Sequence, residues 1–175
     1  MRLLKEVVLG FFLVSTAALA GQDDVLLRLA IENANIKPEQ AIQKVVDQYP
    51  GNLSEFEIDD EDGAMIYEFK VIDHKKGVEL ELMMDAETGR IWLDDKETIP
   101  SNILKLKKYQ LLMNSGVTLQ KAVDEARKLV QGLLINVELE QEKGIVFFEI
   151  EFLTEKGERK VIVDLQSGKP IPVTR

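Results

Sequence analysis

Two short segments of the sequence carry the residue types of a catalytic or metal-binding loop. Asp85-Ala86-Glu87-Thr88-Gly89 and Asp164-Leu165-Gln166-Ser167-Gly168 each present an aspartate, a hydroxyl residue and a glycine at the same spacing. Their oxygens could ligate a cation or accept a phosphoryl group. An aspartate can also accept backbone N–H bonds within a tight turn, where glycine supplies a positive φ. Because each segment follows a run of alternating apolar residues, we favour closing turns of β-strands.

An acidic run, Asp59-Asp60-Glu61-Asp62-Gly63, superficially resembles a calcium-binding loop. If Gly63 took the sixth position of an EF-hand loop, Ile58 and Phe69 would stand at positions one and twelve, where oxygen ligands are required. The run is therefore interpreted as a solvated acidic hairpin.

The residues of common enzyme sites are scarce in this sequence. His74 is the only histidine and cysteine is absent, so the donors of a conventional zinc centre are missing. His74 stands beside Lys75 and Lys76 in a predicted turn, where we expect its ring to be exposed to solvent. Neither a Ser-His-Asp triad nor a phosphate-binding glycine loop is supported. We predict a chain that is not an enzyme and has no catalytic residue, no metal site and no cofactor.

Glutamates alternate with apolar residues along the predicted strands and share one side of a sheet in the expected register. The candidate partner-binding face consists of Glu57, Glu68, Glu79 and Glu81, with Lys70 as the main counter-charge. Its second-copy counterpart contains Glu138, Glu149, Glu151 and Lys160. Two interpretations stay open: a solvated face whose charges are screened by salt, and a docking surface for a basic partner.

The elements that position these residues occur twice in the chain. With a constant offset of 81, residues 36–75 align with residues 117–156 without a gap. The aligned identities include Ala41 with Ala122, Gly51 with Gly132, Glu57 with Glu138, Gly63 with Gly144 and Glu68 with Glu149. Two single-residue deletions later, Asp85 aligns with Asp164 and Gly89 with Gly168. This self-similarity predicts an internal duplication.

Each copy reads as an amphipathic helix followed by alternating strands. The first helix begins at Pro38 and ends before Pro50-Gly51, and the second has Thr118 as N-cap and Gly132 as its stop. Short, glycine-containing connections between the strands favour antiparallel neighbours. The predicted fold class is α+β: two tandem repeats, each a helix packed on a three- to four-stranded antiparallel β-meander and preceded by an additional helix.

The expected domains are a signal peptide (1–20), a first domain with its N-terminal helix (21–97) and a second domain with its connecting helix (98–175). Because the connecting helix joins the copies, we expect a rigid, two-lobed molecule. Trp92, on the last strand of the first copy, is expected to pack between sheet and helix or between the lobes.

The first twenty residues have the layout of a secretory signal. Arg2 and Lys5 precede an apolar run from Val7 to Val14, and Ala18-Leu19-Ala20 forms a small-x-small end. We predict cleavage after Ala20, a periplasmic or secreted product and no stable membrane insertion afterwards. Without cysteine, neither a lipoprotein processing site nor a disulfide is available. The net charge of −9 disfavours nucleic acid as a partner.

The order of helix, turn and strand signals resembles the PepSY domain, a module of metallopeptidase propeptides and other exported bacterial proteins. The resemblance rests on Ala41, Pro50, Gly51, Gly63, Tyr67-Glu68-Phe69-Lys70-Val71 and Asp85-Ala86-Glu87-Thr88-Gly89. It covers residues 36–95 well and residues 117–173 more loosely, with Phe148 in place of the tyrosine and Ser167 in place of the threonine. The resemblance implies a noncatalytic domain that inhibits or regulates peptidases, which we expect to act in trans.

The leading hypothesis is an exported, noncatalytic binding protein that regulates or inhibits a peptidase or another envelope protein. The alternative is a periplasmic sensor or accessory protein that binds cations or peptides through its acidic surface. The expected partner is a protein, such as a peptidase or a membrane sensor.

Overall fold

A computed structural model of the chain describes residues 20–173. Its elements are α1 (Ala20–Asn33), α2 (Pro38–Gln48), β1 (Asn52–Glu61), β2 (Ala64–Asp73), β3 (Val78–Asp85), β4 (Ile91–Thr98), α3 (Ser101–Leu104), α4 (Lys107–Asn114), α5 (Leu119–Arg127), β5 (Leu133–Glu142), β6 (Ile145–Thr154), β7 (Gly157–Asp164) and β8 (Pro170–Pro172). The predicted signal peptide falls on residues that lie, apart from Ala20, outside this range, and its cleavage stays a prediction. Within residues 20–173, no helix is long and apolar enough to cross a membrane.

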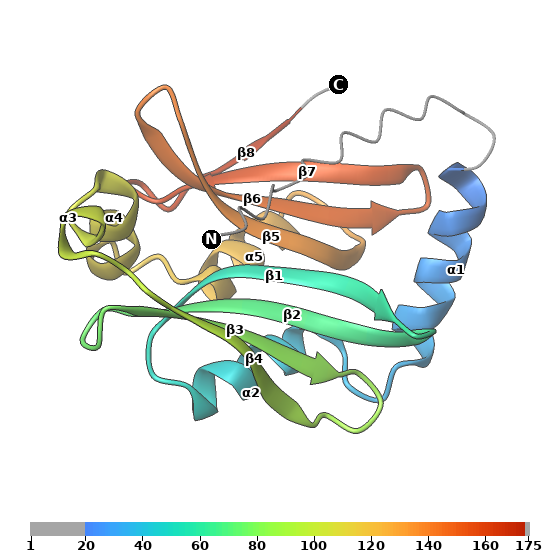
Figure 1. The fold of residues 1–175 in the computed structure, drawn as a ribbon. Helices are drawn as coiled ribbons and strands as arrows, with labels where there is room; N and C mark the ends of the chain where they lie inside the picture. Colours follow the sequence, from blue (N-terminus) through green and yellow to red (C-terminus); the bar gives the residue numbers. More distant parts are fainter. Residues whose placement is uncertain (1–19, 174–175) are drawn as a thin grey trace, which may run out of the picture.

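The eight strands form one antiparallel sheet in the order β4-β3-β2-β1-β5-β6-β7-β8. Helices α2 and α5 contact each other and lie behind this sheet in Figure 1. We call the opposite side, which faces the viewer, the open face. An antiparallel sheet can expose one face to water when helices cover the other. The predicted α+β class, with a helix on a four-stranded meander in each copy, is confirmed.

The covering helices bury one apolar stripe each. Four residues of α2 (Pro38, Ala41, Ile42, Val45) and four of α5 (Leu119, Ala122, Val123, Ala126) are buried. This spacing of three and four residues places the apolar side chains on one side of a helix. The hydroxyl of Thr118 caps α5 by accepting a hydrogen bond from the backbone N–H of Lys121 at 3.2 Å, as predicted.

Three aromatic rings form the centre of the first copy's core. Phe56, Tyr67 and Phe69 are fully buried, and the Phe56 ring lies 5.6 Å from the Tyr67 ring and 5.4 Å from the Phe69 ring. The Tyr67 hydroxyl donates to the carbonyl oxygen of Ile36 at 2.7 Å. The polar tip of this ring is therefore satisfied inside an apolar core.

The two copies meet along β1 and β5. The paired residues are Glu55 with Glu138, Phe56 with Val137 and Glu57 with Asn136. Under the 81-residue offset Val137 is the equivalent of Phe56, so the pairing is symmetric about these two residues. The copies are thus related by an approximate two-fold axis that passes between Phe56 and Val137.

Both copies retain the same local irregularities. The register shifts at Ser54 in β1 and at the equivalent Ile135 in β5. In the hairpins that follow, Asp62 and the equivalent Lys143 have φ angles of 53° and 49°. A β-bulge changes the direction of a strand and is usually kept among related structures. Its recurrence at equivalent positions therefore supports the internal duplication.

The additional helices occupy opposite ends of the sheet (Figure 1). The 14 residues of α1 correspond under the offset to residues 101–114, which the second copy divides into α3 and α4. Ile31 of α1 packs against Ile135 and Leu153, which belong to the second copy. The expected pair of lobes is therefore one body, because the two sheets join edge to edge and a helix of the first copy is buried on strands of the second.

Candidate functional site

The aspartates of the two recurring segments hold tight turns. The Asp85 carboxylate accepts the backbone N–H groups of Glu87 and Thr88 at 3.0 and 2.7 Å and the Thr88 hydroxyl at 2.9 Å. Asp164 accepts the backbone N–H and the hydroxyl of Ser167 at 2.9 and 2.7 Å. The structural interpretation of both segments is confirmed, since the carboxylates serve the turn itself.

The acidic run between β1 and β2 forms a hairpin turn. Asp62 and Gly63 both have positive φ, as do Lys143 and Gly144 in the second copy. Two successive positive φ angles are typical of a two-residue hairpin loop. Within residues 20–173, no group of three or more His, Cys, Asp or Glu side chains is arranged to hold a metal ion.

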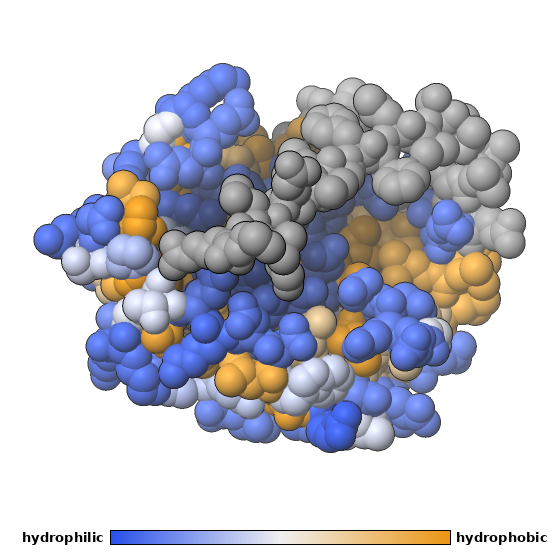
Figure 2. All heavy atoms as spheres, viewed as in Figure 1, coloured by the Kyte–Doolittle hydropathy of each residue, from blue (hydrophilic) through white to orange (hydrophobic). Residues whose placement is uncertain are grey.

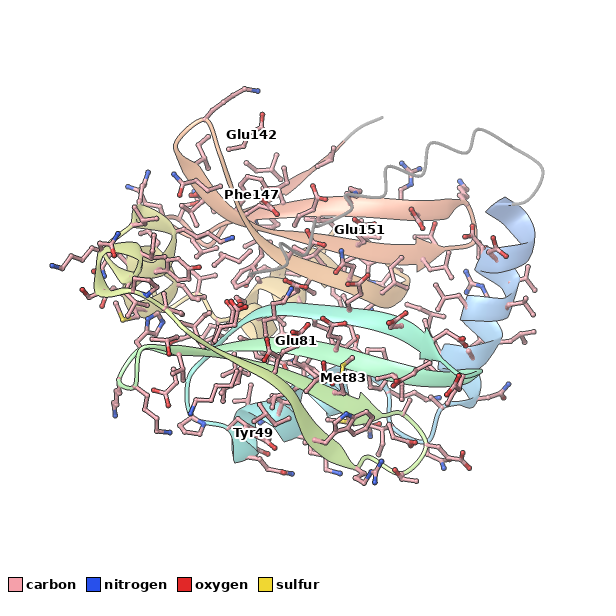
Figure 3. The ribbon with its side chains drawn as sticks, in the orientation of Figure 1. Tyr49, Glu81, Met83, Glu142, Phe147 and Glu151 are labelled. Atoms are coloured by element: carbon pink, nitrogen blue, oxygen red, sulfur yellow. The ribbon has the colours of Figure 1, made fainter. Side chains whose placement is uncertain are left out.

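The four glutamates predicted to bind a partner lie on the open face. Glu57 of β1 stands opposite Glu68 of β2, and Glu81 of β3 stands opposite Lys70. Glu79 lies two residues before Glu81 and therefore points to the same side. Figure 3 labels Glu81 and, on the second copy's half of the sheet, Glu151. The strand register places the four glutamates on the same face of the sheet. That this face binds a partner stays a prediction.

One lysine from each copy neutralises part of the acidic face. Lys70 pairs with Glu55 at 2.8 Å, and Lys160 of β7 pairs with Glu149 at 2.7 Å and Glu151 at 2.5 Å. Lys70 stands opposite Glu81, while their second-copy equivalents are Glu151 and Lys160. In the first copy the lysine is on β2 and the glutamate on β3, whereas in the second copy the glutamate is on β6 and the lysine on β7. Around each lysine, carboxylates outnumber ammonium groups.

Burial and mutual repulsion raise the pKa values of three of the four predicted glutamates. A hydrogen bond with Glu81, followed by burial, raises the pKa of Glu68 to about 7. Burial, followed by the charges of Glu55 and Glu138, raises the pKa of Glu57, and burial is the main cause of the raised pKa of Glu79. The hydrogen bond between Glu68 and Glu81 requires one of the two carboxyl groups to carry a proton. A cation placed beside these carboxylates would favour their charged forms and displace that shared proton.

The sequence predicted an acidic face in each copy but did not predict that the two faces join. Glu55 stands directly opposite Glu138 across the β1–β5 pair, so the acidic surface continues from one copy into the other. Figure 2, viewed toward the open face, shows hydrophilic residues over the middle of the sheet. The internal repeat identified Glu138 as the equivalent of Glu57, but nothing in the local sequence indicated that β5 would pair with β1.

The same duplicated unit is found by comparison with known families. A family model described as "peptidase propeptide and YPEB domain", or PepSY, matches residues 35–91 and again residues 116–171. The two matches begin 81 residues apart and together span more than half of the chain. The chain belongs to the PepSY family. PepSY domains are associated with the propeptide-like regulation of peptidases, and the family is generally noncatalytic.

Further comparisons place this PepSY chain near one solved structure. It is similar to a crystal structure of a protein from Clostridium difficile 630 that carries a provisional lipoprotein description, with 20% identity and a TM-score of 0.46. The similarity covers 83% of this chain and 97% of that one. No curated protein shows a significant match.

The closing turn of the first PepSY unit supports a stability prediction. Asp85→Ala is expected to lower the free energy of unfolding by about 0.5–1.5 kcal/mol, because two backbone N–H donors and a hydroxyl of this exposed turn lose a charged acceptor. Hydrogen bonds, first from the Thr88 backbone, hold the pKa of Asp85 below its usual value. Its contribution is therefore present above pH 4 and is lost as pH falls through the lowered pKa.

Urea unfolding at pH 7 and at pH 3 measures this contribution. Glu87→Ala, in the same turn but with an exposed side chain, is the matched control and should change stability by less than about 0.5 kcal/mol. Equal effects of the two substitutions would show that the Asp85 carboxylate does not hold the turn.

The expectation that His74 is exposed was wrong. Both ring nitrogens of His74 are buried and have no hydrogen-bond partner within residues 20–173. Burial lowers the pKa of His74, against a smaller opposing effect of Asp73. The segment that links the two PepSY units covers this turn, since the N–H of Ile99 donates to the Gly77 carbonyl at 2.8 Å. The local sequence could not predict this long-range contact, because the neighbours of His74 in sequence are charged.

Trp92 also lies elsewhere than predicted. It stands opposite Met83, which in turn stands opposite Glu68, so both apolar side chains belong to the open face and not to the helix-covered core. The Arg90 guanidinium lies 5.2 Å from the centre of the indole ring, and Figure 3 labels Met83. The acidic surface of this PepSY chain is thus bordered by a half-buried apolar pair on β3 and β4.

The shared proton of Glu68 and Glu81 predicts an unusual pH dependence. Because the pKa of Glu68 rises from 4.5 to about 7 on folding, the native state binds more protons than the unfolded state between these values. The contribution of Glu68 to the free energy of unfolding is fully present below pH 4.5 and is lost as the pH rises toward 7. Glu68→Gln should flatten this decline, which we expect to be about 1 kcal/mol after allowance for solvent screening of a half-exposed group.

Thermal or urea unfolding from pH 4.5 to 7.5 tests this dependence. Glu140→Gln, an exposed residue of β5, is the control and should give a curve parallel to that of the parent chain. A Glu68→Gln variant whose stability still declines in parallel with the parent would exclude the shared proton.

Proposed function

We propose that this protein is an exported, noncatalytic binding protein that regulates a peptidase or another envelope protein through its open face. One observation carries the proposal: carboxylates from both PepSY units gather on the uncovered side of a single sheet. Glu57 illustrates the effect, since the charges that raise its pKa include Glu55 of its own copy and Glu138 of the other. A surface assembled across the seam is available only when both units are present.

Electrostatics favours a basic partner for this face. Like charges on neighbouring strands destabilise a sheet, and an arriving cationic group relieves their repulsion. Complementary charge also steers a partner and accelerates its association at low salt. The apolar pair Met83 and Trp92 at the border offers the partner a surface to bury, as aromatic and methionine residues do in many interfaces.

The family supports the choice of a peptidase as the partner. PepSY domains are associated with peptidase propeptides, which contact the enzyme without performing its chemistry. The apolar run and small-x-small end of residues 1–20 support export to a compartment where such peptidases act. Regulation in trans then requires a surface that is free to meet a separate protein.

Capture from the native envelope tests this function. The purified protein, cross-linked in a fresh envelope extract, is expected to retain a peptidase and to change its rate of substrate cleavage when both are purified. Retention of a membrane sensor without any peptidase would overturn the peptidase assignment and favour the sensor hypothesis. A shift in thermal midpoint on addition of Ca²⁺ or Mg²⁺ would favour the cation-binding form of that alternative.

A further inference from the structure

The approximate two-fold axis generates two equivalent clefts on the helix-covered side of the molecule. In one, the N-terminal turn of α2 meets the C-terminal turn of α5; in the other, the N-terminal turn of α5 meets the C-terminal turn of α2. The first is lined by Pro38, Glu39, Arg127 and Leu134, and the second by the equivalent residues Leu119, Gln120, Val46 and Leu53. Sequence differences between the copies therefore show which groups each cleft has gained or lost.

The side chain of Arg127 lines the first cleft, which keeps a volume of about 280 Å³ beside it. Its guanidinium pairs with Glu39 of the other copy and donates to the carbonyl oxygen of Gly132 at 2.9 Å. The same group lies 5.2 Å from the centre of the Phe152 ring. Arg127 is also in the last turn of α5, where a cation is favoured by the carbonyl groups of the helix end.

The second cleft has acceptors in the same places but no arginine of its own. Val46 stands where Arg127 does and is 50% exposed, and Gly51 stands where Gly132 does. Gln120 replaces Glu39, and its side-chain oxygen is buried without a hydrogen-bond partner within residues 20–173. A buried acceptor left without a donor costs free energy, so this oxygen favours an incoming N–H group.

The size and electrostatics of the second cleft fit a guanidinium group. Its volume is about 90 Å³, roughly that of three water molecules in the liquid. The last turn of α2 contains no basic residue, so its terminal carbonyl groups lack the cation that α5 has in Arg127. Leu53, Leu112 and Leu119 line the apolar wall against which the methylene groups of an arginine can pack.

We propose that the cleft between the C-terminal turn of α2 and the N-terminal turn of α5 is a docking site for an arginine side chain of a protein partner. The guanidinium donates to the Gln120 side-chain oxygen and the Gly51 carbonyl, in the position that Arg127 fills in the other cleft. This site lies on the opposite side of the sheet from the open face and is independent of the proposed function.

Titration with N-acetyl-L-arginine amide, followed by the amide signals of the ¹⁵N-labelled protein, tests the site. We expect saturable shifts of the Gln120 side-chain amide and of the Val46 and Gly51 backbone amides, with a dissociation constant on the order of 1 mM for this single side chain. N-acetyl-L-citrulline amide, which has the same shape without the charge, is expected to bind at least about tenfold more weakly.

Two variants keep the outcome decisive. Val46→Arg combined with Gln120→Glu supplies the second cleft with its own ion pair, and it should abolish these shifts. Gln120→Ala leaves the cleft open without its acceptor and should weaken binding about tenfold. Unchanged affinity in both variants, or the absence of saturable shifts at the cleft in the parent protein, would overturn the proposal.

The same titration separates this site from the open face. The triple variant Glu57→Gln, Glu68→Gln and Glu81→Gln should leave the shifts at Gln120 unchanged. Shifts confined to the glutamates of the open face would overturn the arginine site while remaining consistent with the proposed function.

Discussion

Replacing Phe56 with alanine is expected to lower the free energy of unfolding by about 3–5 kcal/mol and to destabilise both copies together. Phe56 is fully buried, contacts the rings of Tyr67 and Phe69, and stands at the centre of the β1–β5 seam. The loss combines the transfer free energy of the ring with the cavity that it leaves. Because β1 pairs with a strand of each copy, the damage reaches the second copy directly.

Urea unfolding followed by tryptophan fluorescence and far-ultraviolet circular dichroism measures this effect. Trp92 reports on the first copy, whereas circular dichroism reports on both, so the two signals should coincide in a single transition. Ile145→Ala is the control for side-chain truncation, since Ile145 is 54% exposed and should cost less than about 1 kcal/mol. Separate transitions of the two probes would show that the copies fold independently.

Removing the charges of Glu57, Glu68 and Glu81 together is expected to weaken partner binding by at least about a hundredfold. The triple glutamine variant keeps the size of the side chains and removes the attraction to a basic surface. A loss of this size corresponds to about 2.7 kcal/mol, within the range for truncation of close charge pairs at an interface. The same change relieves repulsion within the sheet, so the free energy of unfolding at pH 7 should stay equal or rise.

The matched control removes three charges outside the open face. Asp60→Asn and Asp62→Asn in the β1–β2 hairpin, combined with Asp124→Asn on the exposed side of α5, remove the same total charge, and asparagine tolerates the positive φ of position 62. This control should bind within about threefold of the parent, and calorimetric titration against the captured partner compares the two. Equal weakening in both triple variants would indicate a nonspecific dependence on net charge.

The duplicated units could be predicted from sequence because their signals are local. Apolar spacing, Thr118 as a cap and the glycines of the turns each act over a few residues, and the 81-residue offset showed them twice. The shared side of Glu57 and Glu68 followed from strand alternation alone. These features needed no knowledge of how distant segments pack.

The features that escaped prediction are all long-range. The β1–β5 pairing joins residues about 80 positions apart. The local sequence of β1, the edge strand of its meander, does not predict that this edge pairs with a second strand. The ring nitrogens of His74 are buried although its sequence neighbours are charged, and the distant Ile99 forms a backbone hydrogen bond to the same turn at Gly77. The pairing of Arg127 with Glu39 likewise depends on how α2 and α5 meet across the two-fold axis.

Carboxyl footprinting of the complex tests the central claim most directly. Carbodiimide-driven labelling with glycine ethyl ester, read by mass spectrometry, reports how accessible each carboxylate is with and without the bound partner. We predict that Glu57, Glu68 and Glu81, together with Glu138 of the second copy, are protected at least fivefold, while Asp60 and Asp62 of the β1–β2 hairpin are labelled equally in both states. Unchanged labelling of these glutamates in a saturated complex would contradict the assignment of the open face as the partner-binding surface.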